Sequence, residues 1–466
     1  MVDASQRHLL RDGLTFKLLC AALCFGLSGS GRGLDEGLIA STVAEQSFIN
    51  EFHMHADYLS ASQRANRLSN VTSMVHIGSL PGAVLAFILS ERIGMLWTMR
   101  ELCLMWIVGS VIFITSANNS IGQVYAGRFI IGLGLGQAGV VAPIYLAEVA
   151  PRRMRGMMVN MYGMSEYLGI VIGYFSIWGA SIHISNSSAK QWVIPQSVQI
   201  MWAGILFLIS FFCEESPRFL CKKDRVDDAC NALASIWNLP PTHELVQTEL
   251  RNTRIQLELE YQQTASRRWI DTFRELFMTA ANLKRIAFVF VLQCLSQWSG
   301  PNSVTTYAPE LFGIFGISGE YEKLLTTAVF GVVKLTCALV SALLLVDYLG
   351  RRKTLYLGLV IQIVALVYDS IFLTVYSNLS EVTKQAAPAR HAAMGSVVML
   401  FFVGVGWALG WNSVQYLITA ELFPLRVRIV GSSLVTCWHY ANRMGLSKVS
   451  LFASDNGNDI RIELGY

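Results

Sequence analysis

Charged side chains inside long apolar runs are the features of this sequence whose chemistry stands out first. Asp35 lies in RGLDEGLIA, within an apolar run over residues 14–39, and Arg128 lies near the start of the apolar run 121–146. A charged side chain in the middle of a membrane helix costs about 2.5–3.5 kcal/mol on insertion scales, so by default it signals a function. We therefore expect Asp35 and Arg128 to serve the function of the chain and to lie at a similar depth.

A second charged pattern, A-E-x-x-P-x-R-x-R, occurs at two distant places. The copies are AEVAPRRMR, residues 147–155, and AELFPLRVR, residues 420–428, and each follows a long apolar run that contains several glycines. Their charged residues at matching positions are Glu148, Arg153 and Arg155 in the first copy, and Glu421, Arg426 and Arg428 in the second. We expect each copy to end a membrane helix at the same face of the membrane, where its glutamate can meet arginines of neighbouring short loops.

These charges are exceptions in an apolar chain. Of its 466 residues, 53% are hydrophobic and 15% are charged, and the mean hydropathy is +0.44. An ordinary soluble chain carries about a quarter charged residues, and about 20 apolar residues suffice to cross a bilayer core. Eleven such runs cover residues 14–39, 71–89, 102–117, 121–146, 157–182, 193–213, 286–308, 324–346, 354–376, 393–420 and 429–453. A large soluble core is the alternative, but soluble helices show a polar face that these runs lack.

The spacing of the runs divides the chain into five parts. The predicted parts are a cytoplasmic N-terminal tail (1–13), a first bundle of six membrane helices (14–213), a cytoplasmic helical linker (214–285), a second membrane bundle (286–453) and a polar tail (454–466). A charged motif repeated in both bundles indicates internal duplication, which is frequent in transporters. The sequence therefore predicts an all-α polytopic membrane protein.

The distribution of basic residues predicts a cytoplasmic N-terminus. The loops after the second, fourth, eighth and tenth runs hold Arg92, Arg100, Arg152, Arg153, Arg155, Arg351, Arg352, Lys353, Arg426 and Arg428. Short loops rich in lysine and arginine stay cytoplasmic. The N-x-S/T sequons, which are glycosylation candidates, fall in loops on the opposite side, at Asn70, Asn118, Asn186 and Asn378. Both patterns agree on the same topology, and we expect the plasma membrane as its location.

Other classes of site find no support in the sequence. The nine cysteines are scattered without a C-x-x-C pair, and His53 and His55 lie in a polar loop, so we expect no metal site. The net charge of +4 is spread along the loops, which argues against a nucleic-acid partner. We expect a monomer surrounded by membrane lipid that has no resident cofactor and is not an enzyme.

Five motifs together resemble those of the sugar porter family of the major facilitator superfamily. In chain order they are GRFIIGLGLGQAGVVAPIYLAEVAPRRMRG, EESPRFL, QWSGPNSVTTYAPELF, VDYLGRRKT and AELFPLRVR. Details such as RGLDEG, GWNSVQYL and GSSLVTCWHYANRMG are most similar to the fungal members of that family. The resemblance extends from about Leu14 to Phe452.

This resemblance implies a major facilitator fold of two six-helix bundles, the second of which is apparently truncated before its twelfth helix. It implies a secondary active transporter that moves a sugar or related polyhydroxylated solute across the membrane by alternating access, with proton symport. Two alternatives stay open. One is a uniporter or a carrier of organic acids such as quinate on the same fold, and the other is a transport-inactive truncated paralogue or nutrient sensor.

The resemblance also assigns roles to the charged residues. Asp35 and Arg128 match a neighbouring pair that proton-coupled members carry, with the proton as the coupling ion, and a static ion pair is the alternative. A charge cluster at the cytoplasmic helix ends, here called the cytoplasmic latch, would comprise Glu91, Glu148, Arg153, Arg155, Glu215, Arg218, Asp347, Arg351, Arg352, Glu421, Arg426 and Arg428. Simple anchoring of these charges at lipid headgroups is the alternative. The arginines that follow the acid in the family are missing after Glu91, so either Arg92 or Arg100 would replace them or this half of the latch would be weaker.

Substrate contacts are implied first on helix seven. Gln297 and Asn302 match the second glutamine and the asparagine of the family pattern Q-Q-x-S-G-x-N, and amides suit sugar hydroxyls because they both donate and accept hydrogen bonds. Gly300 and Pro301 allow the helix break that would bring both amides to one face. Tyr307 would gate the site above them.

The other implied contacts lie on helix ten. Trp411, Asn412 and Tyr416 occupy the region where the family has G-P-x-x-W, with Tyr416 at the tryptophan position. On helix five the family's sugar-binding glutamine is replaced by Gly163. These departures leave room for polyols, oligosaccharides or cyclic acids as the solute, and ordinary helix packing is the alternative role of each residue.

Overall fold

The fold is known from a computed structural model. It describes residues 15–43, 45–54, 60–116, 120–151, 154–185, 188–262, 276–300, 304–305, 308–317, 319–341, 345, 348–377, 387–412, 422–423 and 427–455. Every regular element within these ranges is helical. Seven of the described helices are long and apolar enough to cross a membrane. The protein is therefore an all-α polytopic membrane protein, as the sequence predicts.

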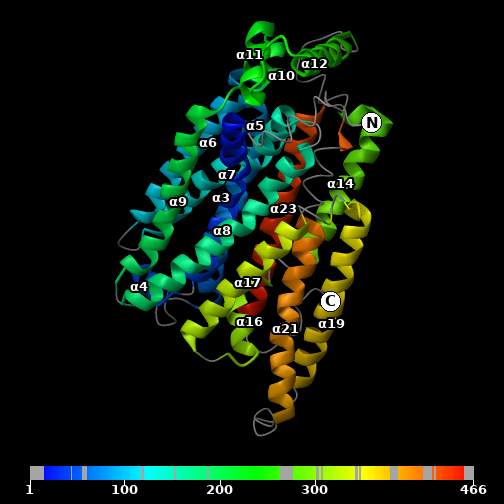
Figure 1. Cartoon of the computed structure of the whole chain (residues 1–466). Helices are drawn as coiled ribbons and strands as arrows, with labels where there is room; N and C mark the ends of the chain where they lie inside the picture. The colour runs from blue at the N-terminus through cyan, green and yellow to red at the C-terminus, as the bar shows by residue number, and fades with distance from the viewer. Residues whose placement is uncertain are drawn as a thin grey trace.

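The N-terminal half forms a bundle of long helices (Figure 1). Its elements are α2 (Phe16–Ala21), α3 (Gly29–Thr42), α4 (Gln46–Glu51), α5 (Ala61–Ile93), α6 (Met95–Ile114), α7 (Ile121–Val149), α8 (Arg155–His183) and α9 (Lys190–Ile209). A π-helical segment, Ala22–Gly26, separates α2 from α3. The first predicted membrane run is thus an interrupted helix rather than a continuous one.

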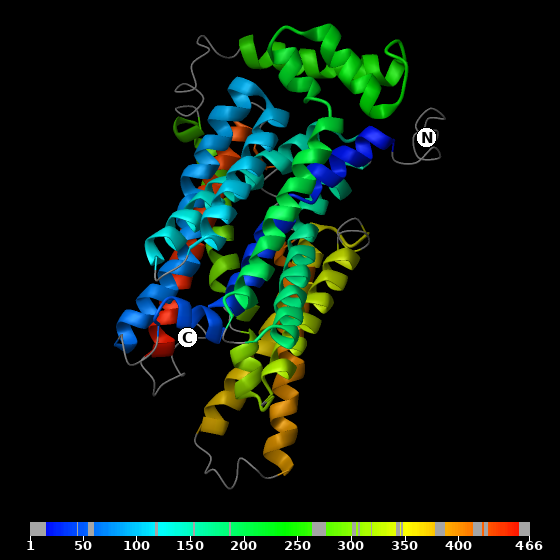
Figure 2. The same ribbon diagram turned by 90° about the vertical axis from the view of Figure 1, so that its left-hand side faces the viewer.

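Three linker helices cap one end of this bundle, at the top of Figures 1 and 2. They are α10 (Pro217–Lys222), α11 (Val226–Trp237) and α12 (Glu244–Gln262). The indole nitrogen of Trp237 donates to the carbonyl of Val149 at 3.1 Å, and the hydroxyl of Tyr145 donates to the carbonyl of Glu214 at 2.5 Å. These two bonds attach the first part of the linker, residues 214–237, to the end of α7 at both of its ends.

The C-terminal half contributes a second group of helices (Figure 1). They are α14 (Ala280–Trp298), α16 (Ala308–Ile314), α17 (Glu320–Val340), α19 (Arg351–Ser377), α21 (Ala387–Leu409) and α23 (Arg428–Asp455). Helix α14 ends just before Gly300, whose φ of +91° is readily adopted only by glycine. The predicted interruption of helix seven therefore begins at this residue.

The two halves meet mainly along three helix pairs. Helix α23 packs against α5 and α7 as well as against α14, and α17 packs against α8 as well as against α21. Within the first half, α3 packs against α8, and α5 against α7. The space between the halves is therefore bordered by α3, α7 and α8 on one side and by α14, α17 and α23 on the other.

Glycines allow unusually close contacts inside the first bundle. A Cβ atom added to Gly33 of α3 would lie 1.7 Å from the carbonyl oxygen of Glu166 on α8. A Cβ added to Gly132 of α7 would lie 2.2 Å from the carbonyl oxygen of Val75 on α5. Small residues at such positions are typical of membrane helices whose backbones touch. The close approach of α3 to α8 brings the charged residues of these two helices together.

Helix α5 corrects one expectation from the sequence. It begins at Ala61 rather than near Val71, because a capping box between Ser60 and Gln63 starts the helix in a polar segment. Asn70 therefore lies inside a helix and is half-buried, and the prediction that this sequon lies in a loop is wrong. The other three sequon asparagines, Asn118, Asn186 and Asn378, lie outside the described residues.

Candidate functional site

Asp35 and Arg128 form a two-point ion pair in the middle of the first bundle. Nη1 and Nη2 of Arg128 donate to Oδ1 and Oδ2 of Asp35 at 3.0 and 3.1 Å. The arginine side chain is fully buried, and the aspartate side chain is 6% exposed. Nε of Arg128 also donates to the carbonyl of Val71 on α5, and the guanidinium lies 5.8 Å from the ring centre of Phe113 on α6. Helices α5, α6 and α7 thus fix the arginine, while α3 carries the carboxylate.

A second buried ionic group lies beside this pair and joins the two halves of the protein. Nη2 of Arg443 on α23 donates to Glu36 on α3 at 2.7 Å, and its Nη1 lies 3.8 Å from Glu166 on α8. Nε of Arg32 lies 3.2 Å from the same Glu166 carboxylate. We call Arg32, Glu36, Glu166 and Arg443 the bridging network, because α3 and α8 belong to one bundle and α23 to the other.

Sequence analysis missed three members of this network. It gave no role to Arg32, Glu166 or Arg443. The signal was the same one that identified Asp35, a charge inside an apolar run, because all three lie within predicted membrane segments. Their burial is now visible, with 4–8% of each residue exposed.

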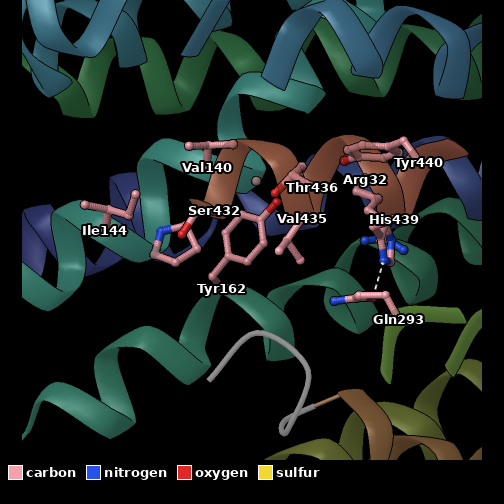
Figure 3. A pocket seen from close by; sticks show the side chains of 12 residues that line it. Arg32, Val140, Ile144, Tyr162, Gln293, Ser432, Val435, Thr436, His439 and Tyr440 are labelled. Carbon is pink, nitrogen blue, oxygen red and sulfur yellow. Dashed lines mark hydrogen bonds between the residues drawn. The ribbon is translucent and has the colours of Figure 1, made fainter. Parts of the chain in front are cut away.

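A small pocket lies next to the bridging network, between α7, α8, α14 and α23 (Figure 3). Nδ1 of His439 lies 3.0 Å from Oε1 of Gln293, and the Arg32 guanidinium lies 5.8 Å from the ring centre of Tyr440. The cavity measures about 30 Å³, whereas sites for small organic ligands usually measure about 300–1,000 Å³. A sugar-sized solute would enter only if the surrounding helices moved apart.

Gln297 lies beside this pocket at the end of α14. Its side chain is buried, and its Nε2 donates to the hydroxyl of Ser296 at 3.1 Å and lies 3.2 Å from Nδ1 of His439. His439 Nε2 has no hydrogen-bond partner in the part of the chain that the structure describes. Gln293, Gln297 and His439 thus form a polar group that faces the space between the bundles.

Trp411 and Asn412 lie at the end of α21, against α8. Nδ2 of Asn412 donates to the carbonyl of Gly163 on α8 at 3.0 Å. This bond joins the two halves of the protein. Gly163 is the residue that replaces the family's glutamine on helix five. Nε1 of Trp411 is buried and has no acceptor among the described residues. The other proposed substrate contacts, Asn302, Tyr307 and Tyr416, lie outside the described residues.

The first half of the cytoplasmic latch is centred on the segment before α10. Glu215 accepts hydrogen bonds from the backbone nitrogens of Met95 at 3.0 Å, of Leu96 at 3.2 Å and of Ser216 at 2.9 Å. Burial raises the pKa of the Glu215 carboxyl, and these three backbone donors oppose the shift. The carboxylate therefore caps the first turn of α6, which joins the linker to the bundle.

Glu148 and Glu91 meet cations from the same linker helix. Nε of Arg218 lies 3.8 Å from Glu148, which also accepts from the hydroxyl of Ser216. Lys222 pairs with Glu91. The latch expectation is corrected here, because neither Arg92 nor Arg100 takes the place of the missing family arginines.

Two further arginines have partners that sequence analysis did not anticipate. Nη2 of Arg100 donates to the carbonyl of Ser210 at 3.2 Å, and its guanidinium lies over the rings of Trp97 and Phe211. Arg155 reaches Glu249 of the linker helix α12, at 3.6 Å. The first-half latch thus connects the bundle to the linker rather than to the neighbouring short loops alone.

In the second half of the latch, the structure describes the side chain of Arg352 alone. Arg352 is exposed at the start of α19, and Arg351 and Arg428 begin α19 and α23 with side chains that are not described. The remaining latch residues outside the described ranges are Arg153, Asp347, Glu421 and Arg426.

Within the described ranges, no group of three or more His, Cys, Asp or Glu residues could hold a metal ion.

The chain was compared with known proteins at the levels of family, sequence and structure. Residues 21–452 match the family described as "Sugar (and other) transporter". The MFS-type transporter qa-x of Neurospora crassa is 29% identical over 424 residues, which cover 89% of this chain and 76% of that protein. A quinate permease of Emericella nidulans is 30% identical over 409 residues, which cover 85% of this chain and 73% of that protein.

Solved structures show the same fold. The major facilitator proton:xylose symporter XylE, bound to 6-bromo-6-deoxy-D-glucose, superposes with a TM-score of 0.77 at 20% identity and covers 95% of this chain and 90% of that one. The inward-open form of XylE from E. coli superposes with a TM-score of 0.70 and covers 95% of this chain and 91% of that one. The family match, which extends over most of the sequence, and these superpositions together show that the chain belongs to the sugar porter family of the major facilitator superfamily.

Proposed function

We propose that this protein moves a sugar or related polyhydroxylated solute across the membrane by alternating access and couples that movement to a proton. The observation that carries the proposal is the buried, two-point Asp35–Arg128 ion pair. A carboxylate held in this way can gain and lose a proton as the arginine moves away from it and returns. The proton is the only coupling ion in the proposal.

The transport cycle follows from the unequal anchoring of the two partners. Arg128 is held by the Val71 carbonyl and lies near the Phe113 ring, whereas Asp35 lies on the same helix as Arg32 and Glu36 of the bridging network. Movement of α3 that accompanies solute binding would draw Asp35 away from Arg128. The carboxylate would then take up a proton, because a buried charge without a counter-charge is unfavourable. Reversal of the movement on the other side would release the proton.

Polar groups between the bundles supply the solute contacts in this proposal. Gln293, Gln297 and His439 offer both donors and acceptors, as a polyhydroxylated ring requires, and the Trp411 indole adds a donor. Asn302, Tyr307 and Tyr416 remain proposed contacts from the sequence motifs. The relatives named quinate permease and the structural neighbour named as a proton:xylose symporter support a hydroxylated ring as the solute and a proton as the coupling ion.

The setting of this activity is also part of the proposal. The protein would act as a monomer in the plasma membrane, with its N-terminus in the cytoplasm, without a resident cofactor and without enzymatic activity. The latch residues would hold the cytoplasmic ends of the bundles in one of the two access states. The alternatives are a uniporter or organic-acid carrier and a transport-inactive paralogue or nutrient sensor.

Uptake measurements in a host that lacks its own sugar transporters test the proposal. Radiolabelled sugars, polyols and cyclic acids should be screened at external pH 5 and pH 8, with and without a protonophore. Accumulation above the external concentration that disappears with the protonophore supports proton symport. Equilibration that is independent of pH indicates a uniporter, and binding without uptake indicates a sensor or an inactive paralogue.

A further inference from the structure

Lys334 is a buried cation that the proposed transport cycle leaves without a role. It lies on α17 and is 2% exposed. Its ammonium donates to the hydroxyl of Thr305 at 2.8 Å and lies 5.0 Å and 5.3 Å from the ring centres of Tyr167 and Phe330. Such ring contacts stabilise a buried ammonium only in part. Within the described residues, no carboxylate lies at ion-pair distance from it.

The neighbouring carboxylates are already engaged by other cations. Glu36 and Glu166 are close enough to Lys334 to act on it electrostatically, but Glu36 pairs with Arg443, and Glu166 pairs with Arg32 and Arg443. Asp35 is taken by Arg128. Lys334 is therefore the cation of this region that has no carboxylate of its own.

A charge count gives the same result. The buried cations of the region are Arg32, Arg128, Lys334 and Arg443, and the carboxylates are Asp35, Glu36 and Glu166, so four positive charges face three negative ones. Among the described side chains of this region, one positive charge thus has no carboxylate to balance it.

The surroundings of Lys334 indicate where a counter-charge would sit. Tyr167, over which the ammonium lies, packs in the same apolar cluster as Trp407 and Trp411. The Trp411 indole N–H has no acceptor among the described residues. Thr305 lies three positions after Asn302, one of the proposed substrate contacts. A lysine ammonium and an indole donor that lacks an acceptor thus gather beside the proposed solute site.

We propose that the solute carries a carboxylate and that Lys334 is the residue that binds it. The inference rests on the proposed transport function and specifies its solute class as a carboxylated polyol. A surplus buried charge is unfavourable in the empty protein, and a carboxylate supplied by the solute removes the imbalance. Arg32 and Arg443 are poorer candidates, because each already holds a glutamate of the bridging network.

The first test measures binding to the full-length protein purified in detergent. The probes are quinate, shikimate, gluconate and glucuronate, with quinamide and myo-inositol as neutral counterparts. A ligand that binds only the folded state raises the midpoint of thermal unfolding. At least one acid should raise the midpoint of the parent protein, and its neutral counterpart should do so much less. If none of the four acids raises the midpoint, the inference is overturned.

The second test compares variants of Lys334 with a matched control. Lys334→Met should weaken the apparent affinity for the acid about 10- to 100-fold, the usual worth of a charged hydrogen bond, and Lys334→Arg should retain part of it. Lys323→Gln removes a charge at the other end of α17 and should leave binding unchanged. An affinity in Lys334→Met equal to that of the parent would overturn the inference.

A stability measurement separates ligand binding from a packing role. Without ligand, Lys334→Met should unfold at a temperature a few degrees higher than the parent, because a surplus buried charge has been removed. With saturating acid the order should reverse. If Lys334→Met is less stable than the parent in both conditions, the lysine serves packing and the inference fails.

The inference and the proposed function fail in different ways. Uptake of neutral polyols by the parent, with no effect of any acid on uptake or on thermal unfolding, would retain the transport proposal and reject the carboxylate site. Stabilisation by an acid through Lys334 without uptake of any solute would retain the site and reject transport.

Discussion

Asp35 and Glu36 are adjacent in the chain, yet their partners lie in different halves of the protein. Asp35 pairs with Arg128 of α7, within the same bundle. Glu36 pairs with Arg443 of α23, in the other bundle. Successive residues on a helix point about 100° apart, so two neighbouring carboxylates on α3 face different helices.

Because of this difference, the two ion pairs should respond differently when the bundles move relative to each other. A pair inside one bundle separates only when its own helices shift, as we propose for α3, and not merely because the bundles change their relative position. A pair between bundles must lengthen or break, and a broken buried pair leaves charges that require a new partner. We therefore expect Asp35–Arg128 to govern the fold of the first bundle and the proton, and Glu36–Arg443 to govern the balance between access states. Four predictions test this division, from the largest expected effect to the smallest.

Arg128→Gln should have the largest effect. It leaves Asp35 buried without a counter-charge and removes the bonds to the carboxylate and to Val71. The expected loss of unfolding free energy is about 3–5 kcal/mol, measured by thermal or denaturant unfolding of the purified protein. Arg100→Gln is the control, because Arg100 bonds to Ser210 at the bundle end and should lose far less. Equal losses would show that burial of the ion pair is not decisive.

Asp35→Asn should abolish solute accumulation while exchange across the membrane continues. The amide resembles a protonated carboxyl but can neither release a proton nor pair ionically with Arg128. The uptake rate should therefore lose its dependence on external pH between about 5 and 8, the range in which proton-coupled uptake is tested. Glu36→Gln is the neighbouring control and should retain pH-dependent accumulation. Accumulation by Asp35→Asn would identify its ion pair as structural only.

Glu36→Gln and Arg443→Gln should show an interaction energy of about 0.5–3 kcal/mol in a double-mutant cycle of unfolding free energies. The two side chains bond directly at 2.7 Å, so the second substitution should cost less once the first is present. Because the pair is buried, the interaction energy should change little between low and high salt. Additive effects would contradict a direct link between the bundles.

Glu148→Gln and Arg218→Gln, at the cytoplasmic end, should show the smallest effect. Their side chains are 11% and 18% exposed and lie 3.8 Å apart, so we expect an interaction energy of about 1 kcal/mol or less. High salt should reduce this value, in contrast to the Glu36–Arg443 pair. An interaction that is equally strong and independent of salt would remove the distinction between the latch and the buried network.

The sequence predicted individual membrane helices better than their ends. Helix α7 begins at Ile121, as predicted, and extends to Val149. Helix α5 begins at Ala61 because of a polar cap, which a hydropathy pattern does not register. Asn70 was placed in a loop for this reason. Apolar runs report the part of a helix that contacts lipid or core, whereas caps and polar turns extend beyond it.

The candidate site was predictable where a single residue carried the signal. Asp35 and Arg128 were identified because a charge in an apolar run is costly wherever the helix packs. Arg32, Glu166, Lys334 and Arg443 meet the same criterion and were overlooked, because the motifs that contain Arg32 and Arg443 assigned them no role and no motif covers the other two. Their pairing was not accessible in any case, since Glu36 and Arg443 are 407 positions apart in the chain.

The sequence by itself determined the membrane helices, the family and the presence of costly charges within the helices, because hydropathy and charge are properties of single residues and short segments. The tertiary structure alone decided which charges meet. Glycines on α3 let its backbone touch α8 beside Glu166, and the packing of α23 against the first bundle brings Arg443 to Glu36. The direction in which each side chain points follows from its helix, but its partner depends on which helix lies opposite. That choice fixed the partners of Asp35 and Glu36, and among the described side chains it left Lys334 without a carboxylate partner.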